Sequence, residues 1–302
     1  MESIQQIKGR INSVSSTRQI TQSMHMVSSS KIVKSRARMV ANREFLAETQ
    51  KMVDIASASL EVRDHLFLKP KQKQGEAEKV EKAEKAEKAV MIVLSSDRGL
   101  CGSFNANVCK EAHARMKEFD NVKIITVGSK GKDYFRRRKP NSLEKSYTGL
   151  SEKPFFEDAA DILDPILEMY HNGEIQSVYL VYTKFVNMLT QLPTVKKLLP
   201  VEPDMASSAT AQVSALGPET TEFLEHIVPF YIKCCLFGAM LEASVCEQSS
   251  RVASMDTAVK NAEEMIGKLT LTYNKARQSS ITQEMIEIIG GAKAVQKEKV
   301  KG

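Results

Sequence analysis

The sequence predicts an α/β protein with a long α-helical coiled coil: an antiparallel coiled coil of the N- and C-terminal helices, with a central α/β domain between them in the chain. Two long segments that lack helix breakers predict the helices. Residues 3–60 contain no proline and one glycine, and residues 230–289 contain no proline and two glycines. Between these segments, short runs of β-branched and aromatic residues alternate with helical patterns, which predicts the domain.

The N-terminal helix carries an irregular heptad pattern. Its first apolar positions follow spacings of three and four residues, at Ile4, Ile7, Ile11 and Val14. The next two positions in this seam are Arg18 and Thr21, and we expect Met24 and Val27 to resume it. At 1.5 Å per residue, a helix of roughly 60 residues is about 90 Å long, so a second helix of matching length is needed to cover the seam.

The central segment predicts a mostly parallel sheet with helices on both faces. Strands are expected at 90–94, 122–127 and 177–183, with helices around 106–119 and 155–170. The following domains are expected: an N-terminal coiled-coil helix (1–68), a charged low-complexity linker (69–89), the α/β domain (90–202), a loop (203–218), and a C-terminal coiled-coil helix with a polar tail (219–302).

The C-terminal helix has the clearest heptad seam. Apolar or small side chains recur at alternating spacings of three and four residues, at Val252, Met255, Val259, Ala262, Ile266, Leu269, Tyr273 and Ala276. This spacing is typical of a helix that coils around a partner. The N-terminal helix is the partner of matching length.

Composition excludes several classes of protein. The 302 residues are 42% hydrophobic and 26% charged, which is typical of a folded protein. No run approaches the ~18–20 consecutive apolar residues of a membrane span, and the N-terminus MESIQQIKGR predicts no secretory signal. The five cysteines lack CxxC spacing, so we expect free thiols in a reducing compartment, and the scattered histidines predict no metal site.

The loops that follow two predicted strands contain glycines but match no nucleotide-binding motif. The first reads SSDRGLCGS and the second GSKG, at 128–131. Neither fits GxGxxG or GxxxxGK[ST], so we expect tight turns and no phosphate site. One role open to Asp97 and Arg98 is to orient a ligand, but we expect them to form an ion pair that stabilises the first turn. No catalytic residue and no cofactor are predicted.

The net charge of +6 belongs to one helix. Residues 3–43 contain no acidic residue and the following eight basic ones: Lys8, Arg10, Arg18, Lys31, Lys34, Arg36, Arg38 and Arg43. An exposed helix usually mixes both charges, so this one is expected to face an acidic partner, either nucleic-acid phosphates or protein carboxylates. The segment has no aromatic residue before Phe45, which argues against stacking on bases. From the residues alone, a basic nucleic-acid-binding coiled coil and an enzyme built on the α/β domain remain alternatives.

Three segments resemble the signature segments of the gamma subunit of F-type ATP synthases. They are SVSSTRQITQSMHMVSSSKIVKSRARM, SSDRGLCGSFNANV and SSRVASMDTAVKNAEEMIGKLTLTYNKARQSSITQEMIEIIGGA. The segment VYTKFVNMLTQLPTVKKLLP also fits this family, and the segments follow the order in which the family has them. The resemblance implies a Rossmann-like α/β domain at the foot of a rotating coiled-coil shaft, in a non-catalytic subunit that couples ion-driven rotation of the c-ring to the catalytic beta subunits.

The resemblance also implies partners and a location. Three alpha and three beta subunits would surround one copy of this chain, and the epsilon subunit and the c-ring would bind its foot. The chain would lie at the cytoplasmic face of a bacterial cell membrane, peripheral to it through the c-ring, and no nucleic acid would be bound.

By the same resemblance, two groups of residues would contact the beta subunits. Arg277 and Gln278 match a pair that engages an acidic catch loop, with Thr282 and Glu284 nearby. Met24 and Arg251 match positions where the two helices meet a beta subunit, a region associated with coupling. The basic face of the shaft would comprise Lys8, Arg10, Arg18, Lys31, Lys34, Arg36 and Arg38.

Overall fold

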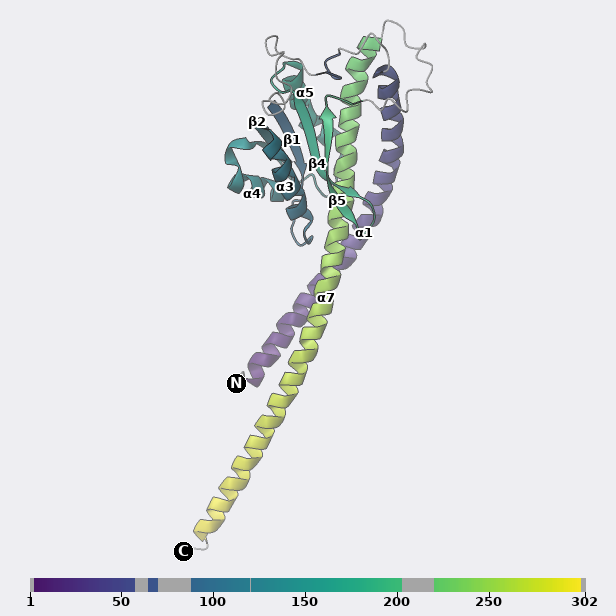
Figure 1. The fold of residues 1–302 in the computed structure, drawn as a ribbon. Coiled ribbons are helices and arrows are strands. Elements are labelled where there is room, and N and C mark those ends of the chain that lie inside the picture. The colour runs from purple at the N-terminus through teal and green to yellow at the C-terminus, as the bar shows by residue number, and fades with distance from the viewer. Residues whose placement is uncertain (1–2, 58–64, 70–87, 120, 203–219, 300–302) are drawn as a thin grey trace. The chain divides into compact units, whose positions relative to one another are not determined.

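The computed structural model describes most of the chain, namely residues 3–57, 65–69, 88–119, 121–202 and 220–299 (Figure 1). The predicted linker at 69–89 lies almost entirely outside these residues, and the predicted loop at 203–218 lies entirely outside them. The predicted domain boundaries therefore stay predictions.

The chain forms two compact units. Unit 1 consists of Met1–Val27 and Ala253–Gly302, and unit 2 of Ser28–Val252. Two long helices, α1 (Ile4–Ser57) and α7 (Thr220–Lys299), each contribute to both units. The predicted long helices at both ends of the chain are confirmed.

Unit 2 contains a five-stranded mixed sheet with the order β3-β2-β1-β4-β5. All strands are parallel to their neighbours except β5, which is antiparallel to β4. The strands are β1 (Lys88–Leu94), β2 (Asn121–Val127), β3 (Leu143–Tyr147), β4 (Ser177–Phe185) and β5 (Gln191–Leu199). The mostly parallel sheet is confirmed, although β3 and β5 were not predicted.

The remaining helices of unit 2 lie between the strands in sequence. They are α3 (Phe104–Arg115), α4 (Ser129–Arg138) and α5 (Phe156–His171), with 3-10 turns at Met116–Glu118 and Pro140–Ser142. Helix α4 was not predicted; only residues 128–131, which include its first three residues, were interpreted, as a tight turn.

Alternate side chains of β1 enter two hydrophobic cores, one on each face of the sheet. Met91 and Val93 pack with residues of α3 and α4. Ile92 and Leu94 pack with residues of α5, α1 and α7. The period of two along a strand explains this division, and it explains why the strand is almost entirely apolar.

Helix α7 contributes much of the second core. It contains an 18-residue stretch that is long and apolar enough to cross a membrane by length and composition, but 67% of this stretch is buried inside the protein. Such burial is typical of a core helix. The part of α1 in unit 2 runs antiparallel to α7, because Arg43 pairs with Glu242 while Gln50, further along α1, contacts Tyr231, which lies earlier on α7.

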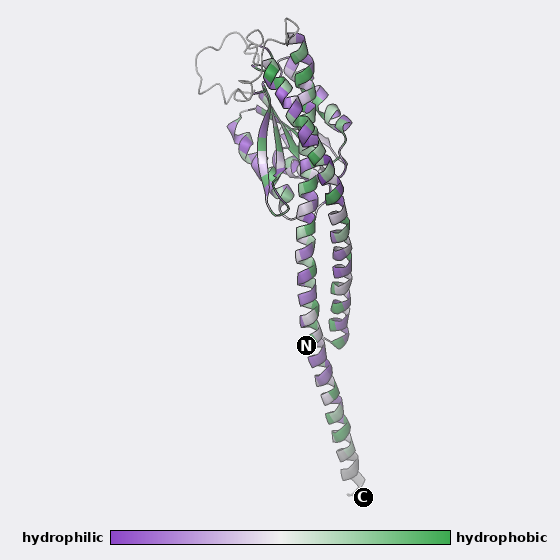
Figure 2. Cartoon of the chain, turned by 90° about the vertical axis from the view of Figure 1, so that its right-hand side faces the viewer, coloured by the Kyte–Doolittle hydropathy of each residue, from purple (hydrophilic) through white to green (hydrophobic). Residues whose placement is uncertain are grey.

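Unit 1 is an antiparallel pair formed by the start of α1 and the end of α7. The Arg18 guanidinium lies 3.1 Å from the Glu263 carboxylate. The hydrogen bond from Lys260 lowers the pKa of the Asp256 carboxyl group, and the charge interaction with His25 of α1 acts in the same direction. Figure 2 shows hydrophobic and hydrophilic residues alternating along both helices. All eight predicted seam residues of α7, from Val252 to Ala276, are buried or half-buried.

The seam of α1 differs from the prediction after Thr21. Val27 is 56% exposed, whereas Ser28 is only 3% exposed. The strict alternation of three and four places His25 and Ser28 in the seam, so the expectation that Val27 resumes it was wrong. The helix keeps its register through polar residues, and the buried Thr21 hydroxyl donates to its own helix, to the carbonyl of Thr17 at 2.7 Å.

Candidate functional site

The predicted catch-loop residues lie on a part of α7 that extends past the beginning of α1. Arg18 pairs with Glu263, so in an antiparallel pair Ile4, fourteen residues earlier, lies opposite Arg277, fourteen residues later. Arg277, Gln278 and the two further predicted contact residues are all exposed. Within the described residues, no hydrogen bond or ion pair involves the Arg277 guanidinium.

The last two residues of this group have contacts within α7. The Thr282 hydroxyl donates to the Gln278 carbonyl at 2.9 Å, and the Ser280 hydroxyl donates to the Glu284 carboxylate at 3.4 Å. These contacts leave the side chains of Arg277 and Gln278 available to a carboxylate on another protein.

The same end of α7 exposes large apolar side chains, and Figure 2 shows green, hydrophobic residues among hydrophilic ones along this part of the helix. They are Ile281, Met285, Ile286, Ile288 and Ile289. They share one broad face of the helix, and an exposed apolar face of this kind is normally covered by other protein. This end of the helix therefore has the properties of a surface that another protein covers.

The basic residues of α1 do not form one free face. In unit 1, Arg18 pairs with Glu263. In unit 2, Lys31 pairs with Glu152 at 2.8 Å, and Arg38 donates to the Pro154 carbonyl at 2.6 Å.

Arg43, the last of the eight basic residues, pairs with Glu242. Lys8, Arg10, Lys34 and Arg36 are exposed. At least four of the eight basic groups thus bind acceptors of this chain, which reduces the predicted basic face and weakens the nucleic-acid alternative. Met24, in unit 1, is half-buried.

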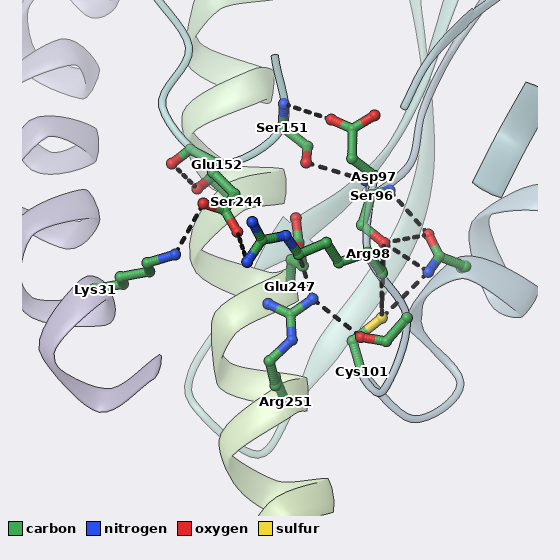
Figure 3. A network of polar contacts seen from close by, with 12 residues as sticks. Lys31, Ser96, Asp97, Arg98, Cys101, Ser151, Glu152, Ser244, Glu247 and Arg251 are labelled. Atoms are coloured by element: carbon green, nitrogen blue, oxygen red, sulfur yellow. Dashed lines mark hydrogen bonds and ion pairs between the residues drawn. The ribbon is translucent and has the colours of Figure 1, made fainter. Parts of the chain in front are cut away.

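Arg251 lies inside unit 2, where its partners belong to this chain (Figure 3). Its guanidinium donates to the Glu247 carboxylate at 2.7 Å and to the Gly99 carbonyl at 3.2 Å. Both charged side chains are buried, Glu247 being 1% and Arg251 5% exposed. Burial raises the pKa of Glu247, although the hydrogen bond from Arg251 acts in the opposite direction.

A second set of contacts surrounds this pair. Glu152 accepts from Lys31 of α1 at 2.8 Å and lies 3.4 Å from the guanidinium of Arg98. The Ser244 hydroxyl of α7 donates to the Glu152 carbonyl at 3.3 Å. The hydrogen bond from Lys31 is the main reason why the pKa of Glu152 is lowered. We call these residues the polar network: Lys31, Arg98, Gly99, Glu152, Ser244, Glu247 and Arg251.

The carboxyl ends of β1 and β2 are filled by groups of the protein itself. The Asp97 carboxylate accepts from the backbone N–H and the hydroxyl of Ser129, both at 3.0 Å, and from the Gly149 N–H at 2.9 Å. Burial alone would raise the pKa of Asp97, but these hydrogen bonds outweigh it and the pKa is lowered. The carboxylate occupies the N-terminus of α4, where a phosphate would bind in a nucleotide site.

The prediction of an ion pair between Asp97 and Arg98 is wrong. Asp97 accepts hydrogen bonds from backbone N–H groups, whereas Arg98 pairs with Glu152. Glu247 was not predicted as a functional residue from the sequence. Its spacing of four residues from Arg251 was a possible signal, but this spacing is common on exposed helices and does not reveal burial. Among the described residues, no group of three or more His, Cys, Asp and Glu side chains could hold a metal ion.

The chain combines an α/β unit with a two-helix unit that exposes an apolar helix end. An exposed apolar surface of this kind is typical of a subunit of a larger assembly. A family model described as ATP synthase matches residues 3–295. A relative named ATP synthase gamma chain, from Desulforamulus reducens, is 37% identical over 298 residues, which cover 98% of this chain and 100% of the relative. The chain therefore belongs to the gamma chain family of ATP synthases.

Solved structures share the fold. One belongs to the mitochondrial ATP synthase of Euglena gracilis, with a TM-score of 0.70 and 19% identity over 98% of this chain and 95% of the other. Another is a component of the central stalk and c-ring of the Tetrahymena thermophila mitochondrial ATP synthase, with a TM-score of 0.59 and 24% identity over 79% of this chain and 99% of the other.

Proposed function

We propose that this chain is the central-stalk rotor subunit of an F-type ATP synthase, which couples ion-driven rotation of the membrane c-ring to conformational cycling of the catalytic beta subunits. Membership in the gamma chain family carries the proposal. The exposed end of α7 supports it, because a central shaft must present a helix that other subunits can surround.

The subunit itself is non-catalytic in this proposal. The α/β domain uses Asp97 to fill the helix N-terminus at which related folds bind phosphate, so the chemistry is left to the beta subunits. One copy would turn inside three alpha and three beta subunits, with the epsilon subunit and the c-ring at the foot. This arrangement would place the chain at the cytoplasmic face of a bacterial membrane.

We assign the contact with the beta subunits to Arg277 and Gln278, with Thr282 and Glu284 in the same region. A guanidinium can bind a carboxylate through two parallel hydrogen bonds, so its grip depends on orientation, as a rotor requires. Met24 and Arg251 are assigned to the coupling region. The partners of Arg251 within this chain suggest that it acts there by holding the chain's own structure.

The test uses the complex of this chain with alpha and beta subunits. We expect Arg277→Ala and Gln278→Ala to leave assembly intact and to lower ATP turnover by roughly tenfold or more, as loss of a hydrogen bond to a charged group predicts. Arg277→Lys should recover part of the loss, because it restores the charge without the two-pronged geometry. The control is Lys268→Ala, at an exposed position earlier on α7, which should turn over ATP as the wild type does. Wild-type turnover in both alanine variants would overturn the assignment of the grip.

A further inference from the structure

The polar network connects the three parts of unit 2 that would carry mechanical load. Glu247 and Arg251 belong to α7, and Lys31 belongs to α1. Arg251 and Lys31 each contact a loop of the α/β domain, at the Gly99 carbonyl after β1 and at Glu152 before α5, while Glu247 pairs with Arg251 within α7. Figure 3 shows these side chains converging between the helices and the loops. Both long helices are thus tied to the same small region of the domain.

The network lies where both helices leave unit 2. Helix α1 enters unit 2 at Ser28, three residues before Lys31, and α7 leaves it at Val252, the residue after Arg251. Among the contacts of the two helices with the α/β domain, those of Lys31 and Arg251 therefore lie within three residues of the points where the helices leave unit 2.

The contacts are directional, whereas the surrounding packing is largely apolar. Apolar side chains permit small rolling movements of a helix because their contacts have no preferred direction. Charge-assisted hydrogen bonds weaken steeply when their geometry changes. A buried ion pair is also weak evidence for added stability, since well-packed apolar residues often replace such a pair without loss.

The loop that Arg251 holds has an unusual backbone. Leu100, directly after Gly99, is the one non-glycine residue with a positive φ among the described residues, at 61°. Such a conformation persists where neighbouring contacts enforce it. The hydrogen bond from Arg251 to the Gly99 carbonyl is one contact that holds this loop in place.

We propose that Glu247 and Arg251, together with the ion pair between Lys31 and Glu152, form a clamp that makes the two shaft helices turn with the α/β domain. These are positioning residues for energy coupling, and the inference rests on the proposed rotor function. The clamp resists rotation of α7 and α1 relative to the domain, so that torque reaches unit 1 with little elastic loss.

The test measures torsional stiffness in the assembled complex. A probe is attached to the α/β domain through Lys110→Cys, an exposed position on α3, because the native thiols are all buried. The ring of alpha and beta subunits is fixed to a surface and stalled, and the angular variance of the probe is recorded. In the double variant Glu247→Met with Arg251→Met, neither charge is left buried and unpaired. We expect the variance to exceed that of the wild type, because the contact of α7 with the α/β domain through the Arg251 guanidinium is lost.

The matched control is Glu264→Met with Lys268→Met, a pair with the same spacing on the same helix whose side chains are exposed. It should leave the variance unchanged. Lys31→Met is a second variant that keeps the buried pair, and it should widen the fluctuations by a smaller amount. Both proposals can fail separately. If the wild-type probe did not turn with ATP, the rotor function would be contradicted, whereas wild-type variance in both clamp variants would overturn the clamp alone.

Discussion

Replacing Ile7 with alanine should loosen unit 1 without affecting the sheet of unit 2. The Ile7 side chain is 1% exposed in the seam between α1 and α7, whereas Ile20, on the same helix and in the same unit, is 63% exposed. Truncating a buried isoleucine to alanine costs about 2–5 kcal/mol, and a seam between two helices can relax, so we expect about 2–3 kcal/mol. Ile20→Ala is the matched control, with the same chemical change at an exposed position.

Native-state hydrogen exchange measures this effect where it occurs. A loss of about 2–3 kcal/mol should speed the exchange of amides in the α1 part of unit 1 by roughly 30- to 140-fold. Amides of β1 should keep their wild-type rates, and Ile20→Ala should change neither group. Equal effects of the two substitutions would refute the heptad seam and its register.

Four further predictions concern the two units and the thiols. Because the pKa of Asp97 is below its ordinary value of 3.8, its carboxylate stabilises the fold above that pH and the contribution is lost as the pH falls through the folded-state pKa. The melting temperature of Asp97→Asn should therefore be lower than that of the wild type at pH 7, and this difference should shrink as the pH falls. A difference in melting temperature that is independent of pH would contradict this. A Cβ on Gly131 would lie 2.7 Å from the Ser95 hydroxyl, which already accepts from the Gly131 N–H, so Gly131→Ala should destabilise unit 2 by about 1–3 kcal/mol in urea unfolding. Gly9→Ala, with open space around the helix, should instead slow hydrogen exchange in unit 1. Finally, burial raises the pKa of Cys109 to about 12, and all five cysteines are buried. A thiol reagent should therefore label the cysteines slowly in the native chain, and it should label all five rapidly after unfolding.

The coiled-coil seam could be predicted from the sequence because helix geometry determines it. Every seam position from Val252 to Ala276 was predicted from spacing and is buried or half-buried. The prediction failed at Val27, where apolar side chains were used as markers of the seam. The seam continues through His25 and Ser28 instead. Thr21 shows how a polar seam residue is accommodated, because its buried hydroxyl donates to the Thr17 carbonyl of its own helix.

The sheet was predicted at its centre and missed at its edges. β1, β2 and β4 are buried on both faces, so their sequences are runs of apolar residues. β5 contains Pro193 and two lysines, which suit an edge strand but match no simple strand pattern. α4 begins at a glycine-containing turn and ends with three arginines, so its amphipathic pattern is hard to see.

The candidate site could likewise be predicted only in part from the sequence. The exposed residues Arg277 and Gln278 could be named from a resemblance, because a family motif contains them. The polar network could not be predicted in this way, because the residues that contact each other lie far apart in the sequence. Arg251 is 152 residues from Gly99, and Lys31 is 121 residues from Glu152. Only the fold brings these groups together, and only the fold shows that the pair of Glu247 and Arg251 is buried.

Rotation is the central claim, and single-complex observation tests it directly. The alpha and beta subunits are fixed to a surface, a probe is attached to the α/β domain of this chain, and ATP is added. The account predicts stepwise rotation in one direction that stops when ATP is removed. A probe that stays still while the same complexes hydrolyse ATP at full rate would contradict it.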